Sequence, residues 1–116
     1  KMSKKTEISY ALRNFIENAI KFSKTKINIR INQQKKNTMI VIDDDGLGFD
    51  ENIISSLGQP YVSSEKVKKN IKGMGLGIFI SKNLLERCSA KVEFSNKENS
   101  GAKIVIEWTN SQLANL

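Results

Sequence analysis

The sequence of 116 residues has no histidine, one cysteine, one proline and few aromatic residues. Because Cys88 is the only cysteine, no disulfide can form within the chain. No apolar run approaches the roughly 20 residues that a membrane-spanning helix needs, and no signal peptide is present. We therefore expect a soluble, cytoplasmic chain that forms one domain over residues 1–116. That length is enough to bury a core without cross-links.

The net charge is +7, and the positive charge is concentrated in residues 1–37 and 63–91. Proteins that bind single-stranded nucleic acid place aromatic residues among the basic ones. The lysine-rich stretches of this chain contain few aromatic residues. We therefore interpret most of the lysines as solvated surface residues, predict no nucleic-acid partner, and expect the domain by itself to be a monomer.

The motif Gly73-Met74-Gly75-Leu76-Gly77 is the feature around which the chain is organised. Three glycines at alternate positions give up side-chain contacts, which indicates close approach of the backbone to another group. Apolar residues follow at helical spacing, so a helix should begin at or just after Gly77. The first amides of a helix favour a phosphate. The motif is neither a P-loop nor a dinucleotide fingerprint, and alone it is equally compatible with a tight turn.

Residues Thr6 to Ser23 are predicted to form an amphipathic helix. Its apolar residues recur at helical spacing; they are Ile8, Leu12, Phe15, Ala19 and Phe22. Asn14, Asn18 and Lys21 follow at steps of four and three, which places them in a polar stripe beside the apolar face. Asparagine is a mediocre helix former, so this position suggests a task for the carboxamides. The alternative is that both asparagines face solvent.

Two strands are predicted next, over residues 27–32 and 38–44, with a polar turn between them. The first alternates apolar and polar residues, which predicts one buried and one wet face. Its expected buried residues are Ile27, Ile29 and Ile31.

The second strand ends in three consecutive acids, Asp43 to Asp45, which would repel one another without partners. By alternation Asp44 lies on the face of Ile40 and Ile42. A helix packed on that face would leave Asp44 at the floor of a cavity. Two glycines follow, Gly46 and Gly48. They let the chain turn without crowding an occupant. An acidic metal cluster is the alternative, but no further carboxylates are placed to complete it.

Residues Gln59 to Lys72 show no periodicity, and a loop of this length in a compact domain is usually functional or disordered. A short helix is expected just before it, near Ile53 to Leu57. Two more alternating stretches, 91–95 and 103–108, predict a hairpin. Its expected inward residues are Val92, Phe94, Ile104, Ile106 and Trp108.

The order of these features resembles the ATP-binding domain of sensor histidine kinases. These domains belong to the Bergerat-fold (GHKL) superfamily, together with topoisomerase, mismatch-repair and chaperone ATPases. The stretches that carry the resemblance are Asn14–Ser23, Asp44–Gly48, Pro60–Tyr61, Gly73–Gly77 and Ser100–Ala102. They appear in the family's order and span nearly the whole chain. Within the family, Gly58–Ser64, Gly73–Ile80 and Leu84–Arg87 are most similar to redox-responsive kinases of the RegB/PrrB type.

The resemblance implies an α/β two-layer sandwich, with helices on one face of a mixed, mostly antiparallel sheet and the nucleotide between the layers. The candidate catalytic residues are Asn14, Asn18 and Lys21. The candidate nucleotide contacts are Asn18, Lys21, Phe22, Asp44, Gly46, Gly48, Tyr61, Gly73, Gly75, Leu76 and Gly77.

The resemblance also assigns roles to these residues. Asp44 would accept a hydrogen bond from the adenine amino group, and Phe22 would pack against the ring. Asn18 would hold Mg²⁺ through its carboxamide oxygen. Lys21 and loop lysines would neutralise phosphate charge, and residues Gln59 to Lys72 would form a lid over ATP.

The implied function is that of the ATP–Mg²⁺-binding catalytic domain of a two-component sensor histidine kinase, on the cytoplasmic side of a membrane-anchored bacterial sensor. Such a domain passes the γ-phosphate to a histidine on a dimerisation domain, and a response regulator acts downstream. This chain departs from the family in lacking that histidine. The strand that usually precedes the first motif is also missing or replaced by Lys1 to Lys5, which predicts an exposed sheet edge.

Two other functions are compatible with parts of this sequence. An ATP-hydrolysing switch is disfavoured because Asn14 stands where such relatives carry a glutamate that activates water. The alternative is a binding module that acts through partner contacts, either a non-catalytic ATP sensor or an anti-sigma-factor-like module.

Overall fold

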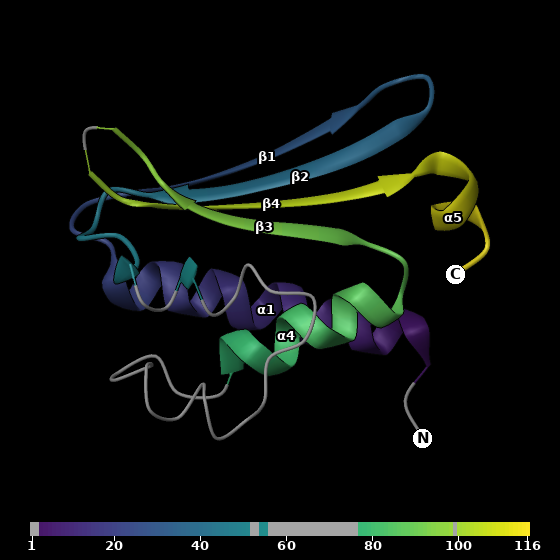
Figure 1. Ribbon diagram of the computed structural model, residues 1–116, viewed down its shortest axis with the longest axis horizontal. Coiled ribbons are helices and arrows are strands. Elements are labelled where there is room, and N and C mark those ends of the chain that lie inside the picture. The colour runs from purple at the N-terminus through teal and green to yellow at the C-terminus, as the bar shows by residue number, and fades with distance from the viewer. Residues whose placement is uncertain (1–2, 52–53, 56–76, 99) are drawn as a thin grey trace.

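The computed structural model describes residues 3–51, 54–55, 77–98 and 100–116 (Figure 1). Its helices and strands are α1 (Lys4–Phe22), β1 (Ile27–Gln33), β2 (Asn37–Asp44), α4 (Gly77–Arg87), β3 (Lys91–Asn96), β4 (Ala102–Thr109) and α5 (Asn110–Ala114). Helices α1 and α4 lie together on one face of the sheet (Figure 1). The predicted two-layer α/β architecture is therefore confirmed.

The sheet has the strand order β1-β2-β4-β3, and every pairing in it is antiparallel. The parallel pair that a mixed sheet requires is therefore not found among the described strands. The register places Ile42 opposite both Ile29 and Ile104. Because directly opposed residues of an antiparallel pair point to the same face, the alternation predicted for β2 continues across its neighbours.

The ends of the two long helices follow from local chemistry. Ser3 caps α1 by accepting a hydrogen bond from the Thr6 amide at 3.2 Å, so this helix begins two residues before the predicted start. It ends at Phe22, one residue before the predicted end. Helix α4 begins at Gly77, as the spacing of the apolar residues predicted.

The core lies between the helices and the inner face of the sheet. Its fully or nearly fully buried residues include Ala11, Phe15, Ala19, Ile42, Ile78, Leu84, Leu85, Val92, Ile104, Ile106 and Trp108. The predicted inward faces of β3 and β4 are confirmed, with Phe94 half-buried. Helix α5 was not predicted, although the Thr109–Gln112 capping box that begins it is visible in the sequence.

The prediction of a buried face for β1 is wrong at two positions. Ile29 is 46% exposed and Ile31 is 72% exposed, although both point to the helix side of the sheet. Strand β1 is an edge strand of the described sheet, and α4 contacts β3 at the opposite side. The predicted exposed sheet edge is thus present at β1 in the described part of the chain.

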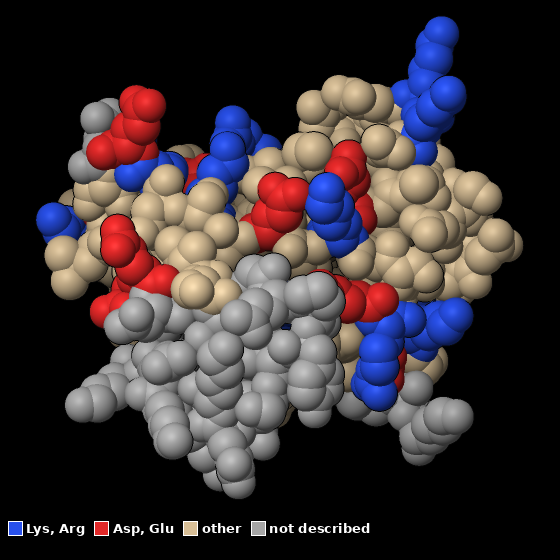
Figure 2. Space-filling model, in the orientation of Figure 1, with Lys and Arg blue, Asp and Glu red and all other residues tan. Residues whose placement is uncertain are grey.

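The surface of the described residues carries both signs of charge. Figure 2 shows Lys and Arg side chains separated by acidic and uncharged ones on this face. No helix among the described residues is both long and apolar enough to cross a bilayer.

Candidate functional site

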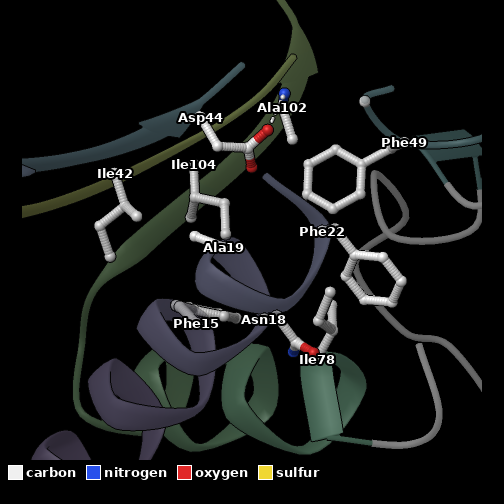
Figure 3. Close-up of a pocket in the computed structure, with 11 residues that line it drawn as sticks. Phe15, Asn18, Ala19, Phe22, Ile42, Asp44, Phe49, Ile78, Ala102 and Ile104 are labelled. Atoms are coloured by element: carbon white, nitrogen blue, oxygen red, sulfur yellow. Dashed lines mark hydrogen bonds between the residues drawn. The ribbon is translucent and has the colours of Figure 1, made fainter. Parts of the chain in front are cut away.

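A pocket lies between the two layers at the end of β2 (Figure 3). Its space measures about 380 Å³ when the part open to solvent is included. The lining residues are Phe15, Asn18, Ala19, Phe22, Ile42, Asp44, Gly48, Phe49, Ile78, Ala102 and Ile104. They come from α1, β2 and the loop after it, β4, and the first turn of α4.

Asp44 provides the acidic group of the pocket. Its Oδ1 accepts hydrogen bonds from the Gly46 amide at 2.8 Å and the Ala102 amide at 3.3 Å. Figure 3 shows the other oxygen, Oδ2, pointing into the pocket. No donor in the described part of the chain reaches Oδ2. Asp44 is 6% exposed, so one fixed acceptor is available inside a mostly apolar space.

Aromatic and aliphatic side chains form most of the remaining wall. Phe15 and Phe49 each pack edge-on against Phe94, with ring centroids 5.7 Å apart. Phe22, the last residue of α1, lines the pocket near Phe49 and Ile78 (Figure 3). A mostly apolar space with one free carboxylate oxygen suits a heteroaromatic ring that carries an N–H donor.

The three predicted catalytic residues of α1 occupy different positions. Asn18 lines the pocket. Lys21 is exposed, and its Nζ lies 5.4 Å from the centre of the Phe22 ring, a cation–π contact at the pocket's edge. Asn14 does not line the pocket. It faces the start of α4, where a Cβ on Gly77 would lie 3.4 Å from its Oδ1.

The donor set near the pocket bears on the metal that the family implies. In the described ranges, no three Asp, Glu, His or Cys side chains gather as a metal site, so the acidic cluster is not found there. Asn18 offers a carboxamide oxygen at the pocket. Mg²⁺ is often bound by one or two protein oxygens together with waters and phosphate oxygens. The residues present therefore fit a Mg²⁺ ion that is bound together with a phosphate ligand.

The loop after β2 contacts the end of α1 and residues of the β3–β4 hairpin. A Cβ on Gly46 would lie 2.1 Å from the Phe22 carbonyl oxygen, so only glycine allows the loop to pass the end of α1. The Ser100 hydroxyl donates to the Gly46 carbonyl at 2.6 Å. Asn96 exchanges two hydrogen bonds with the Phe49 backbone, at 2.7 and 2.8 Å. These contacts fix the loop that connects Asp44 to Phe49.

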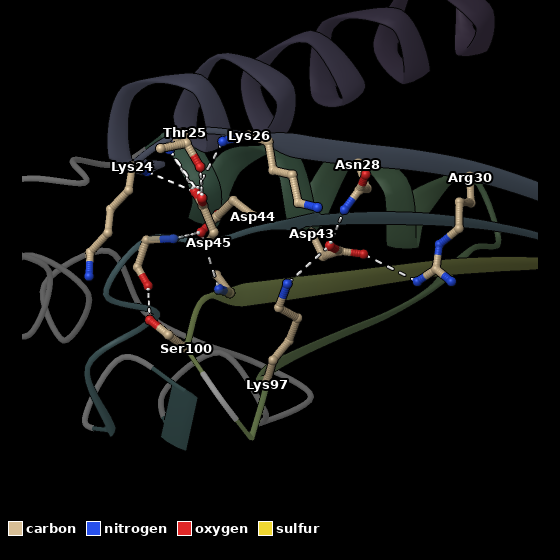
Figure 4. Close-up of polar contacts among 12 residues, drawn as sticks. Lys24, Thr25, Lys26, Asn28, Arg30, Asp43, Asp44, Asp45, Lys97 and Ser100 are labelled. Carbon is tan, nitrogen blue, oxygen red and sulfur yellow. Dashed lines mark hydrogen bonds and ion pairs between the residues drawn. The ribbon is translucent and has the colours of Figure 1, made fainter.

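Asp43 lies on the outer face of the sheet and has its own partners (Figure 4). Asn28, Arg30 and Lys97 each donate to its carboxylate at 3.2 Å. Burial raises the pKa of Asp43, but the hydrogen bonds from Asn28 and Lys97 and the positive charges of Lys97 and Arg30 lower it more, so the pKa lies below its usual range. The three acids form hydrogen bonds with different partners, which offsets the repulsion expected among them.

Sequence reasoning identified only part of the pocket. It missed Phe15 and Ala19 as lining residues, although both were predicted on the apolar face of α1, and it missed Phe49, which directly follows the second glycine of the Asp-x-Gly-x-Gly motif. The other predicted contacts lie outside the described residues; they are Tyr61, Gly73, Gly75, Leu76 and the lid from Gln59 to Lys72.

Comparisons with known proteins agree with this geometry. Residues 3–112 match the family described as histidine kinase-, DNA gyrase B-, and HSP90-like ATPase. Sensor histidine kinase RegB of Cereibacter sphaeroides is 32% identical over 90% of this chain and 26% of its own length. The chain thus spans about a quarter of that relative.

Solved structures show the same fold. The mycobacterial sensor histidine kinase MprB has a TM-score of 0.68 at 20% identity, over 90% of this chain and 72% of that one. Full-length ShkA in complex with AMPPNP has a TM-score of 0.65 at 20% identity, over 88% of this chain and 21% of that one. The chain belongs to the histidine kinase-, DNA gyrase B- and HSP90-like ATPase family, and the relatives that it matches include sensor histidine kinases.

Proposed function

We propose that this chain is the catalytic domain of a two-component sensor histidine kinase, binding ATP with Mg²⁺ and presenting the γ-phosphate to a histidine of another domain. The observation that carries the proposal is the free Oδ2 of Asp44 inside an apolar pocket. Membership of an ATPase family and the similarity to RegB support it. So does the AMPPNP bound to ShkA, which shares the fold.

Asp44 would select the base. Its anchored carboxylate accepts from the exocyclic amine of adenine, whereas guanine presents a carbonyl oxygen at that ring position and would face the acceptor with another acceptor. Phe22 would pack on the ring, beside the Phe49 wall. The pocket would thereby fix the base end of the nucleotide and orient the phosphates toward Asn18.

The phosphate end would rely on α1 and α4. Asn18 would hold Mg²⁺, which supplies charge neutralisation to the phosphates when it is bound. Lys21, exposed at the edge, would turn from the Phe22 ring toward the phosphates. The backbone amide of Gly77, at the start of α4, would bind phosphate oxygens. Asn14 cannot act as a general base, so activation of water for hydrolysis is not expected from that position.

The acceptor must come from outside these residues, because the sequence contains no histidine. We propose a histidine-bearing dimerisation domain as the partner, a response regulator downstream, and a cytoplasmic location. The chain's relatives support this context, since RegB is a sensor histidine kinase and this chain spans 26% of it.

Nucleotide selectivity tests the base-binding role. We expect calorimetry to show ATP binding in preference to GTP, and Asp44→Asn to weaken ATP binding by about tenfold or more, because a hydrogen bond to a charged group contributes about 1.5–3 kcal/mol. Asp43→Asn is the matched control, since Asp43 lies on the opposite face of the sheet, and it should leave the ATP affinity unchanged. Equal affinity of the unmutated protein for ATP and GTP would contradict the assignment.

Phosphotransfer tests the kinase role. With γ-labelled ATP the isolated chain should not label itself. Addition of the histidine-bearing domain of the same kinase should produce labelled acceptor. Asn18→Ala should abolish transfer by removing the Mg²⁺ ligand, whereas Asn32→Ala, an exposed asparagine on β1, should not. Tight ATP binding without any transfer would favour the non-catalytic ATP-sensing module.

A further inference from the structure

Asp45, the third acid at the end of β2, binds the turn between α1 and β1. Its Oδ1 accepts hydrogen bonds from three consecutive backbone amides, those of Lys24 at 2.9 Å, Thr25 at 3.0 Å and Lys26 at 3.2 Å. Its Oδ2 accepts from the Thr25 amide at 3.1 Å and from the Thr25 hydroxyl (Figure 4). One side chain thus binds three consecutive amides of a turn whose residues lie 19 to 21 positions before it in the sequence.

This contact holds Asp45 as a charged acceptor. The side-chain and backbone hydrogen bonds of Thr25 lower the pKa of Asp45 far below its usual value, and the amides of Lys26 and Lys24 lower it further. The carboxylate is therefore ionised throughout the range in which the protein would work. Hydrogen bonds to an ionised acceptor are roughly twice as strong as neutral ones.

The turn directly follows a residue that lines the pocket, Phe22. Phe22 is the last residue of α1, and only Ser23 separates it from the amides that Asp45 binds. The Gly46 backbone lies against the Phe22 carbonyl, at a distance that excludes a Cβ. The stretch from Asp44 to Gly46 therefore makes two contacts here, one from the Asp45 side chain to the turn and one from the Gly46 backbone to the end of α1.

The same stretch holds the group that faces Phe22. The Gly46 amide donates to Asp44 Oδ1, which leaves Oδ2 directed into the pocket. The terminal turn of a helix frays easily when nothing anchors it. Without Asp45, the Phe22 ring and the Asp44 carboxylate would lie on two segments joined by fewer contacts. A pocket that must be ordered on binding loses affinity.

We infer that Asp45 is a positioning residue for nucleotide binding: by fixing the α1–β1 turn, it sets the separation between the Phe22 ring and the Asp44 carboxylate. Asp45 is not among the residues that line the pocket, so it would act through Phe22 and Asp44. This inference rests on the proposed function, since it concerns how the base pocket of that function is assembled.

Two substitutions at Asp45 test the inference, and a substitution at Asp43 is the control. Asp45→Ala removes both acceptor oxygens, whereas Asp45→Asn keeps one oxygen that can accept from the three amides. Asp43→Ala is the matched control, because this carboxylate two residues away is also well hydrogen-bonded but its partners lie on the outer face. ATP affinity is measured by calorimetry under conditions where circular dichroism shows each variant to be fully folded.

We expect Asp45→Ala to weaken ATP binding by about tenfold, Asp45→Asn by about threefold, and Asp43→Ala by less than about twofold. Adenosine should lose affinity for Asp45→Ala by the same factor as ATP, since the affected wall contacts the base. Amide hydrogen exchange should accelerate at Lys24, Thr25 and Lys26 in that variant. A purely structural role would leave the affinity of the folded variant unchanged and would not produce the partial rescue by asparagine.

A folded Asp45→Ala that binds ATP as tightly as the unmutated protein would overturn the inference alone. If Asp45→Ala does not fold, Asp45→Asn and Thr25→Val decide, because each removes only part of the contact; unchanged ATP affinity in both would overturn the inference. Failure of the unmutated protein to bind ATP is a different result, since it would overturn the proposed function as well.

Discussion

Asp43 and Asp44 are neighbours in sequence but serve the two faces of the sheet in opposite ways. On the outer face, Asn28, Arg30 and Lys97 bind both oxygens of Asp43. On the inner face, two backbone amides bind a single oxygen of Asp44 and leave the other facing the pocket. Both side chains are almost fully buried. Burial alone therefore does not distinguish Asp43, whose oxygens are both hydrogen-bonded, from Asp44, for which we propose a binding role; the free acceptor oxygen of Asp44 does.

The apolar residues of the two faces differ in the same direction. Ile106 of β4 faces the helices and is fully buried, whereas its neighbour Val105 faces outward and is only partly buried. The inner face is covered by α1 and α4, while no described helix covers the outer one (Figure 1). Stability should therefore depend on the inner face, and the outer face should tolerate change.

The largest expected effect is on folding, from a cavity in the inner face. Ile106→Ala should lower the free energy of unfolding by about 2–5 kcal/mol, because a buried isoleucine loses both its transfer free energy and its packing contacts. Val105→Ala, one residue away on the outer face, should cost less than about 1.5 kcal/mol. Urea denaturation of both variants measures the difference. Equal losses would mean that the outer face is as well packed as the inner one.

A second prediction disturbs Asp44 without changing its side chain. Gly101 has φ +114°, and a Cβ there would lie 1.9 Å from the Asp44 carbonyl oxygen. Gly101→Ala should therefore destabilise the fold by at least about 1–3 kcal/mol and shift the Asp44 backbone. Thermal unfolding gives the first effect, and ATP affinity of the folded fraction should fall as well.

Gly77→Ala provides the control for Gly101→Ala. Among the described residues, the atoms nearest to a Cβ at Gly77 belong to the flexible Asn14 side chain, at 3.4 Å or more, and alanine favours a helix over glycine by about 1 kcal/mol. Its effect on stability should be small or favourable. Similar destabilisation by both substitutions would contradict the idea that the close contact with Asp44 is what requires glycine at 101.

Local sequence patterns predicted the face of the sheet on which a residue lies and the residue at which a helix begins. Alternation with Ile40 and Ile42 placed Asp44 on the inner face, and the spacing after Gly77 located the start of α4. Alternation also put Ile29 and Ile31 on the helix side, correctly, but it could not show that no helix covers that end of the sheet. Periodicity reports which way a side chain points, whereas burial depends on elements distant in the sequence.

The residues that anchor the segments around the pocket could not be predicted for the same reason. Asp45 binds amides about 20 residues earlier, and Asn96 binds the Phe49 backbone 47 residues away. Neither residue has a local pattern that sets it apart from an ordinary polar residue in a turn. The motif residues of the pocket could be predicted from the resemblance to a family, but their anchors became apparent only from the fold.

The smallest expected effect is the pH dependence that Asp43 contributes. Its pKa is lowered in the folded protein, while in the unfolded chain it should be close to the ordinary value of about 3.9. A lowered native pKa adds stability above the unfolded pKa, and this stability is lost as the pH falls through the native pKa. Because Arg30 is 65% exposed and Lys97 32% exposed, solvent weakens the attraction, and the contribution should be about 1 kcal/mol or less.

Urea denaturation of the unmutated protein and of Asp43→Asn should show a difference in unfolding free energy at pH 7 that shrinks toward pH 3 and decreases with added salt. A difference that stays constant over this pH range would mean that the ion pairs on the outer face contribute nothing to folding, and that the amide of asparagine differs from the carboxylate only in its packing.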